Sequence, residues 1–91
     1  MLKVEKTDQF FLDLEGLVLH IARDNISAAA DLEERIHDQV DRLTDPNFPR
    51  RIGRKAGTLE LVAHPNYVVV LKQTKTLVTA LNVLHVARQY P

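Results

Sequence analysis

The spacing of apolar residues changes once along the chain, and this change restricts the fold more than any other feature. In the first half apolar residues recur every three or four positions, as on one face of a helix. The clearest series is Ala28, Leu32, Ile36, Val40 and Leu43. In the second half they form short runs rich in β-branched residues, such as Val68–Val70, which favour strands. The sequence therefore predicts helices followed by strands, the pattern of an α+β domain.

The first half predicts two helices that form an antiparallel hairpin. Thr7 followed by Asp8 is typical of a helix N-cap with an acid in the first turn. The first helix is expected to end near Asp24 and Asn25, and the second to begin near Ser27, so the connection is short and the helices should pair. The apolar stripe predicted for the first helix is Phe11, Leu14, Leu17, Val18 and Ile21.

The strands are predicted on both sides of this hairpin. Residues 2–6 alternate apolar and charged side chains, as a short half-buried strand does. Three further strands are expected at 59–64, 67–72 and 77–86, and residues 50–58 should form a loop. The order β-α-α-β-β-β predicts a small antiparallel sheet, ending in a three-strand meander, with the helix hairpin packed on it. Val68–Val70 should lie in a central strand that is buried on both faces.

Length and composition set further limits. A chain of 91 residues supports one domain, spanning residues 1–91, with one modest core. The absence of cysteine excludes disulfides, thiolate metal sites and a cysteine nucleophile. The chain has neither a signal-peptide pattern nor an apolar run long enough to cross a bilayer, so we expect a cytoplasmic protein with no membrane partner.

Charge is distributed unevenly, although the formal net charge is zero. Residues 1–46 contain five basic and eleven acidic residues, whereas residues 47–91 contain seven basic residues and a single acid, Glu60. Four of the bases fall within six positions of a glycine-containing segment: Arg50, Arg51, Arg54 and Lys55. Clustered guanidinium groups suit phosphates or carboxylates, and a solvated loop explains the same cluster about equally well.

Few residues offer catalytic or metal-binding chemistry. His20 and His37 fall on separate helices and are expected to be exposed, while His64 and His85 fall at strand ends and could approach each other if those strands are neighbours. No metal site is predicted, because no third ligand is placed beside any of them. If RNA were the substrate, the residues able to transfer protons would be Glu60, His64, His85 and Tyr90.

The order of residues resembles the RelE/ParE superfamily of toxins. The resemblance lies in the segments GRKAGTLELV (53–62), HPNYVVV (64–70) and VLHVARQYP (83–91), and in IARDN (21–25) at the junction of the two helices. It implies the toxic half of a bacterial type II toxin-antitoxin pair, which needs no cofactor. It also implies a cognate antitoxin that neutralises the toxin in a hetero-oligomer.

The superfamily divides into proteins that poison DNA gyrase and endonucleases that cut messenger RNA on the ribosome. The RNA-cutting branch carries Arg or Lys on the strands that face the scissile phosphate, whereas residues 59–63 contain none. The resemblance therefore favours the ParE branch, a gyrase inhibitor without an active site, which would stabilise a plasmid or chromosome. The candidate partner-binding residues are Arg50, Arg51, Arg54, Lys55, His64 and Arg88.

Two alternatives remain open. The first is a ribosome-dependent RNase, whose partners would be the ribosome and messenger RNA and whose catalytic residues would be His85, Arg88 and Tyr90. The second is a non-toxic interaction module with a toxin fold. Whichever applies, acidic residues of the antitoxin are expected to meet Arg50, Arg51, Arg54 or Lys55.

Overall fold

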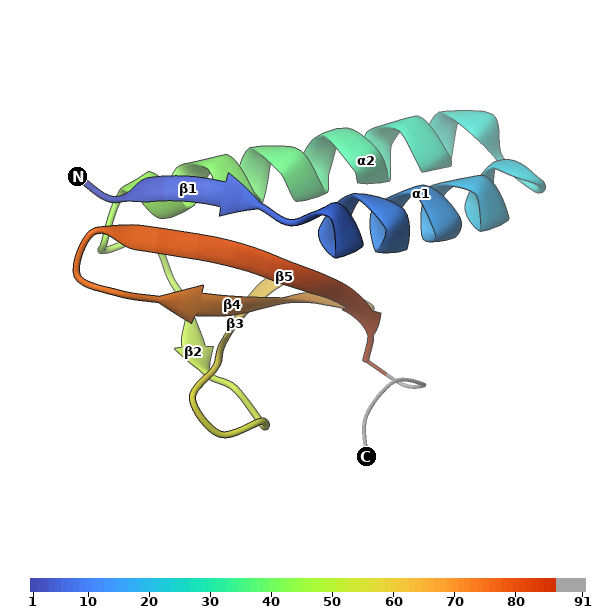
Figure 1. The fold of residues 1–91 in the computed structure, drawn as a ribbon. Helices are drawn as coiled ribbons and strands as arrows, with labels where there is room; N and C mark the ends of the chain where they lie inside the picture. Colours follow the sequence, from blue (N-terminus) through green and yellow to red (C-terminus); the bar gives the residue numbers. More distant parts are fainter. Residues whose placement is uncertain (87–91) are drawn as a thin grey trace.

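A helix hairpin covers one face of a five-stranded sheet in the computed structural model, which describes residues 1–86 (Figure 1). α1 packs over β5, and α2 packs over β3. No helix in this part of the chain is long and apolar enough to span a membrane. The elements in chain order are β1 (Lys3–Lys6), α1 (Asp8–Ala22), α2 (Ile26–Asp41), the 3₁₀ turn η1 (Arg42–Thr44), β2 (Arg51–Ile52), β3 (Leu59–His64), β4 (Tyr67–Gln73) and β5 (Leu77–His85).

The strand order is β1-β5-β4-β3-β2. The predicted antiparallel meander of β3, β4 and β5 is confirmed, and β4 lies at its centre. The triple valine of β4 is buried, as predicted for a central strand whose side chains are covered on both faces. The sheet is not wholly antiparallel, because β1 pairs in parallel with β5, from Lys3 opposite Leu77 to Lys6 opposite Ala80. Residues 2–6 alone do not reveal this direction, which depends on the path of the whole intervening chain.

The core lies between the helices and the facing side of the sheet. From the helices it contains Phe10, Leu14, Leu32, Ile36 and Val40, and from the strands it contains Leu61, Ala63, Val69, Leu71, Val78, Ala80 and Val83. One position of the predicted stripe was wrong. Phe10 is 0% exposed and Phe11 is 48% exposed, because Phe10 lies one helical turn before Leu14 on the face toward the sheet, whereas Phe11 lies at the edge of that face. Phe11 instead lies toward α2, with its ring centroid 6.0 Å from that of His37.

The helix ends are fixed by side-chain caps. The Thr7 hydroxyl oxygen accepts a hydrogen bond from the Phe10 amide at 3.0 Å, as predicted for an N-cap, and the hydroxyl donates to the Leu81 carbonyl at 2.9 Å. The start of α1 is therefore tied to β5. Asn25 caps α2 through the Ala28 amide at 2.9 Å, so it begins the second helix rather than ending the first. That helix ends at Asp41, before Leu43, which is buried in η1.

The segment predicted as a loop at residues 50–58 contains a short strand. β2 pairs antiparallel with the start of β3, with Arg51 opposite Glu60 and Ile52 opposite Leu59. Two residues are too few to produce a detectable period, so this strand could not be found from spacing. β2 is the edge strand of the sheet on the side away from β1.

His37 is half-buried, which corrects the expectation that it is exposed. Lys6 Nζ donates to His37 Nδ1 at 3.0 Å and also pairs with Asp41 at 2.9 Å, so the contact joins β1 to α2. Burial, followed by the charge of Lys6, lowers the pKa of His37, while Asp41 and Glu33 oppose the shift.

We expect stability to fall as the pH drops from about 7.5 to about 5.5, partly through His37, whose ordinary pKa is about 6.5. Its folded pKa lies below the unfolded value, so the unfolded chain binds the proton more readily. The contribution of His37 to stability is therefore fully present above its unfolded pKa. It decreases as the pH falls from the unfolded pKa toward the lower folded pKa. Thermal midpoints at both pH values test this. The drop should be smaller in His37→Gln, and an equal drop in both proteins would contradict it.

Gly16→Ala should raise the free energy of unfolding by about 1 kcal/mol, because glycine in an exposed helix interior is destabilising relative to alanine. Gly16 lies in the middle of α1, and a Cβ placed there has no atom within 4 Å. Urea unfolding measures the change. Gly53→Ala is the contrasting variant, because a Cβ at Gly53 would come within 3.0 Å of the Thr58 carbonyl oxygen. Destabilisation by Gly16→Ala would contradict the open surroundings of that residue.

Candidate functional site

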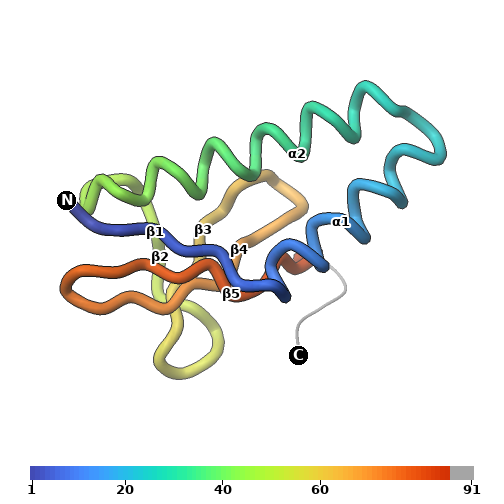
Figure 2. The backbone as a smooth tube through the Cα atoms, turned by 45° about the horizontal axis from the view of Figure 1, so that its top comes forward, coloured from blue at the N-terminus to red at the C-terminus, as the bar shows by residue number. Residues whose placement is uncertain are grey.

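The glycine-containing segment between β2 and β3 forms a closed bend, here called the basic loop (residues 53–58). The Gly53 amide donates to the Thr58 carbonyl at 2.9 Å, and the Thr58 amide and hydroxyl donate back to the Lys55 carbonyl at 3.2 and 2.7 Å. Gly57 has φ of +80°, a conformation that favours glycine. The loop projects from the sheet on the side away from the helices (Figure 2). It therefore presents Arg54 and Lys55 at exposed positions.

Glu60 anchors the basic loop to the sheet. Its side chain is 1% exposed, and Oε1 accepts from Arg51 Nε and Nη2 at 3.1 and 3.0 Å. Oε2 accepts from the Arg54 amide at 3.3 Å. Glu60 was a candidate for proton transfer on sequence grounds. In the fold, this carboxylate holds the base of the loop, because a buried carboxylate is stable only when it is paired and hydrogen-bonded.

The four clustered bases do not share one environment. The guanidinium of Arg50 donates to acceptors within its own chain, and burial lowers its pKa while the nearby Asp45 opposes that shift. Its contacts join the segment after η1 to the end of β4, so Arg50 connects parts of the fold. Its acceptors are the carbonyls of Leu43, Asp45 and Phe48 and the Gln73 side chain. Arg51, Arg54 and Lys55 are the exposed members of the cluster.

His64 and His85 lie on either side of Tyr67. Their ring centroids are 5.5 and 5.2 Å from that of the tyrosine. The strands that carry them are not neighbours, because β4 runs between β3 and β5. His64 Nδ1 accepts from the Asn66 amide at 3.0 Å, which shapes the β3–β4 turn. Burial, together with the charge of Arg35, lowers the pKa of His64 and favours the neutral ring.

The basic loop and the histidines lie at opposite ends of β3. The loop precedes Leu59, His64 is the last residue of the strand, and five steps along a strand span about 16 Å. Arg54 and Lys55 are close to His64 in the sequence but not in the fold. The site residues predicted from the sequence therefore form two groups. Arg88 and Tyr90, which were also predicted, lie outside the residues that the structure describes.

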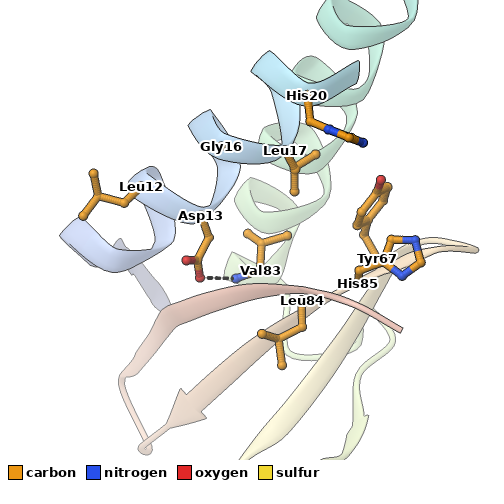
Figure 3. Close-up of a pocket in the computed structure, with 9 residues that line it drawn as sticks. All are labelled: Leu12, Asp13, Gly16, Leu17, His20, Tyr67, Val83, Leu84 and His85. Carbon is orange, nitrogen blue, oxygen red and sulfur yellow. Dashed lines mark hydrogen bonds between the residues drawn. The ribbon is translucent and has the colours of Figure 1, made fainter. Parts of the chain in front are cut away.

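A pocket of about 540 Å³ lies between α1 and the ends of β4 and β5 (Figure 3). Tyr67 and His85 line it beneath His20. Asp13 also lines it, but its carboxylate accepts from the Val83 amide at 3.0 Å, from Asn82 at 3.3 Å and from Gln9 at 2.7 Å. Among residues 1–86, none of those lining the pocket is Lys or Arg. These lining residues therefore offer a phosphate no fixed positive charge.

A smaller hollow of about 330 Å³ lies beside β2 and the start of β3. It extends from Gln39 on α2 to Arg51 and Glu60, and its apolar wall is formed by Phe48, Pro49, Leu61 and Val62. A cation at the rim of an apolar hollow can receive a carboxylate beside an apolar group. Within residues 1–86 no group of three potential metal ligands comes together.

Several site residues could not be identified from the sequence. Tyr67 is the first residue after the Pro65-Asn66 turn, and nothing in its neighbours indicates that it separates two histidines. Asp13 lies outside the apolar stripe predicted for its helix, so the sequence gives no reason to expect it at the sheet. It contacts β5 because Leu81 is an unpaired bulge residue, between the pairs Val70–Asn82 and Leu71–Ala80. A bulge of this kind has no sequence signal here.

Glu60→Gln should lower the free energy of unfolding by about 1–2 kcal/mol, because a neutral amide is a weaker acceptor for Arg51 and carries two donors into a buried site. Urea unfolding measures this loss. Glu34→Gln, at an exposed position of α2, is the matched control and should be nearly neutral. Equal stability of the two variants would contradict the anchoring role of Glu60.

Solved structures share this fold over nearly the whole chain. A chain of the chromosomal ParDE TA system from P. aeruginosa superimposes with a TM-score of 0.82 at 18% identity, over 94% of this chain and 97% of that one. YafQ from E. coli strain BL21(DE3) gives 0.65 at 15% identity, over 100% of both chains. A chain of the E. coli DinJ-YafQ complex gives 0.64 at 14% identity, again over 100% of both. At identities this low, the superpositions show a shared fold alone.

Family membership comes from the sequence. No curated protein matches this chain. The family model of the ParE toxin of the type II toxin-antitoxin system parDE matches residues 4–90, which include both helices, β2 to β5, all of β1 but its first residue, and the basic loop. The resemblance found in the residues is thereby confirmed on its ParE side. The chain belongs to the ParE toxin family of type II toxin-antitoxin systems.

Proposed function

We propose that this protein is the toxic component of its toxin-antitoxin pair and that it acts by binding DNA gyrase, with no active site of its own. The observation that carries the proposal is the composition of β3. The strand contains no Lys or Arg, and Glu60, its carboxylate, is buried against Arg51. An enzyme that cleaves RNA must stabilise the charge of the phosphorane, and β3 offers no cation for this.

The distribution of the other polar groups also favours binding over cutting. Proton-transfer groups and cations must act on the same phosphate. Here His64 and His85 are separated from Arg54 and Lys55 by the length of β3. In the part of the chain that the structure describes, no Lys or Arg lines the pocket beside His85. A surface that only binds a partner does not need proton-transfer groups and cations at the same place.

One observation favours the alternative of a ribosome-dependent RNase. His85 stands edge-on to Tyr67, 5.2 Å between ring centroids, and opens onto the pocket beneath His20. A catalytic site built on His85 would need Arg88 and Tyr90 beside it, and both lie outside the described residues. Messenger RNA on ribosomes is therefore the substrate that distinguishes this alternative from gyrase binding.

We further propose that a cognate antitoxin neutralises the protein by covering the basic loop. Arg51 lines the hollow whose wall contains Leu61 and Val62. Glu60, which also lines it, accepts from the Arg54 amide and so connects the hollow to the exposed basic loop. An antitoxin segment that alternates acidic and apolar residues would pair its carboxylates with the bases and place its apolar groups in the hollow. The DinJ-YafQ complex, which shares the fold, is consistent with a hetero-oligomer of this kind.

Purified protein added to gyrase should abolish supercoiling of relaxed DNA or accumulate cleaved DNA, because gyrase is the proposed target. The antitoxin, added first, should prevent this. Messenger RNA on translating ribosomes, incubated with the same preparation, should remain intact. Unaffected gyrase together with cut messenger RNA would establish the RNase instead. Normal growth of cells that express the protein without antitoxin would defeat both toxic functions and favour a non-toxic interaction module.

Lys55→Glu should weaken antitoxin binding by about threefold to tenfold, and more at low salt, because it replaces attraction by repulsion at an exposed interface. Titration calorimetry at two salt concentrations measures the change. Lys3→Glu is the matched control, since it makes the same charge change on β1, at the opposite edge of the sheet from the basic loop. Equal affinities for the two variants would exclude the basic loop from the antitoxin interface.

A further inference from the structure

The outer face of α1 carries large apolar side chains that the fold does not bury. Leu12 is 62% exposed and Leu19 is 60% exposed. They lie on the side of the helix opposite the buried Phe10 and Leu14. Figure 3 shows the Leu12 side chain pointing away from Tyr67 and His85. Two leucines at this spacing form a stripe along the outside of the helix.

Gly16 lies between these leucines, four residues after Leu12 and three before Leu19. A Cβ at this position would have no atom within 4 Å, so no contact inside the chain requires a glycine. Glycine lowers helix stability, and alanine would fit here equally well. A glycine on an exposed helix surface does have one clear physical use, which is to allow another backbone to approach closely.

Opposite charges stand at the two ends of the stripe. Asp8 lies four residues before Leu12, and Arg23 lies four residues after Leu19; both are exposed. Neither forms an ion pair within residues 1–86. The series of acid, leucine, leucine and base is therefore symmetrical about the peptide that joins Glu15 to Gly16. Reversing the direction of the helix exchanges the two leucines and exchanges the acid for the base.

We propose that a second copy of this chain binds the outer face of α1, with the two α1 helices antiparallel. In this arrangement Leu12 of each copy lies opposite Leu19 of the other, and Asp8 lies opposite Arg23, so each contact occurs twice, as two-fold symmetry requires. Gly16 lies at the crossing point. A parallel arrangement would place Asp8 against Asp8 and Arg23 against Arg23, which charge repulsion disfavours.

The pairing is expected to be weak and dependent on concentration. The contact involves one helix from each copy, which is a smaller surface than a standard stable interface of about 800 Å² per partner. It leaves the basic loop uncovered in each copy, because that loop projects from the sheet on the side away from the helices. The inference rests on α1 alone and does not depend on gyrase being the target.

Sedimentation equilibrium of the purified protein tests the pairing. The mean mass should rise from one copy toward two as the concentration increases from about 5 µM to about 500 µM, the range expected for an interface below standard size. Asp8→Arg and Arg23→Asp should each abolish self-association, since each places like charges opposite each other twice. An equimolar mixture of these two variants should associate again, because every facing pair is then opposite in charge.

A mass of one copy throughout the wild-type series would overturn the proposal, and so would failure of the mixture to associate. Circular dichroism of both variants checks that each retains its helices. If Asp8→Arg weakens the antitoxin complex while wild-type free protein stays a single copy, the outer face of α1 belongs to the antitoxin, and the proposal is also overturned.

Cross-linking tests the direction of the helices in a chain that contains no native cysteine. A mixture of Leu12→Cys and Leu19→Cys should form a disulfide dimer under mild oxidation. Leu12→Cys alone should not, because the two cysteines would lie about 10 Å apart along the paired helices, beyond the reach of a disulfide. Cross-linking of Leu12→Cys alone to at least the extent seen in the mixture would contradict the antiparallel arrangement.

Discussion

The packing of the helix hairpin against one side of the meander determines which residues of the sheet remain for function. Side chains alternate along a strand, so Leu61 and Ala63 must be apolar to fill the core beneath the helices. The intervening positions of β3, Glu60 and Val62, face the other side of the sheet. Neither of them is a cation, and the carboxylate is held by Arg51. β3 therefore has apolar residues on the side facing the helices and no Lys or Arg on the other side, so it is unsuited to stabilising a phosphate.

The order and type of the main elements could be predicted because each has a strong local signal: the Thr7 cap, the stripe of α2 and the valine run of β4. The features that were missed depend on contacts between distant segments. β1 pairs with β5 in parallel, and the two residues of β2 form a strand by pairing with the start of β3. His37 is half-buried because β1 brings Lys6 to it. Periodicity within one segment contains no information about such partners.

In the candidate site, too, contacts between distant segments could not be predicted from local sequence patterns. The sequence places four basic residues within positions 50–55, but the fold gives them different environments. Arg50 donates to carbonyls of its own chain, whereas Arg54 and Lys55 are exposed on the basic loop. The family resemblance identified the class of protein where spacing alone could not. The division of polar groups between the two ends of β3 then provides the physical reason to favour a protein that binds its target over one that cuts it.

Direct binding to gyrase is the measurement that tests this account most closely. Purified protein and gyrase, mixed without RNA or ribosomes, should form a saturable complex in a sedimentation experiment, and supercoiling should be lost over the same range of protein concentration. Absence of a complex at concentrations where the same preparation cuts messenger RNA on ribosomes would contradict the account. In that case the function would belong to the His85 end of the sheet.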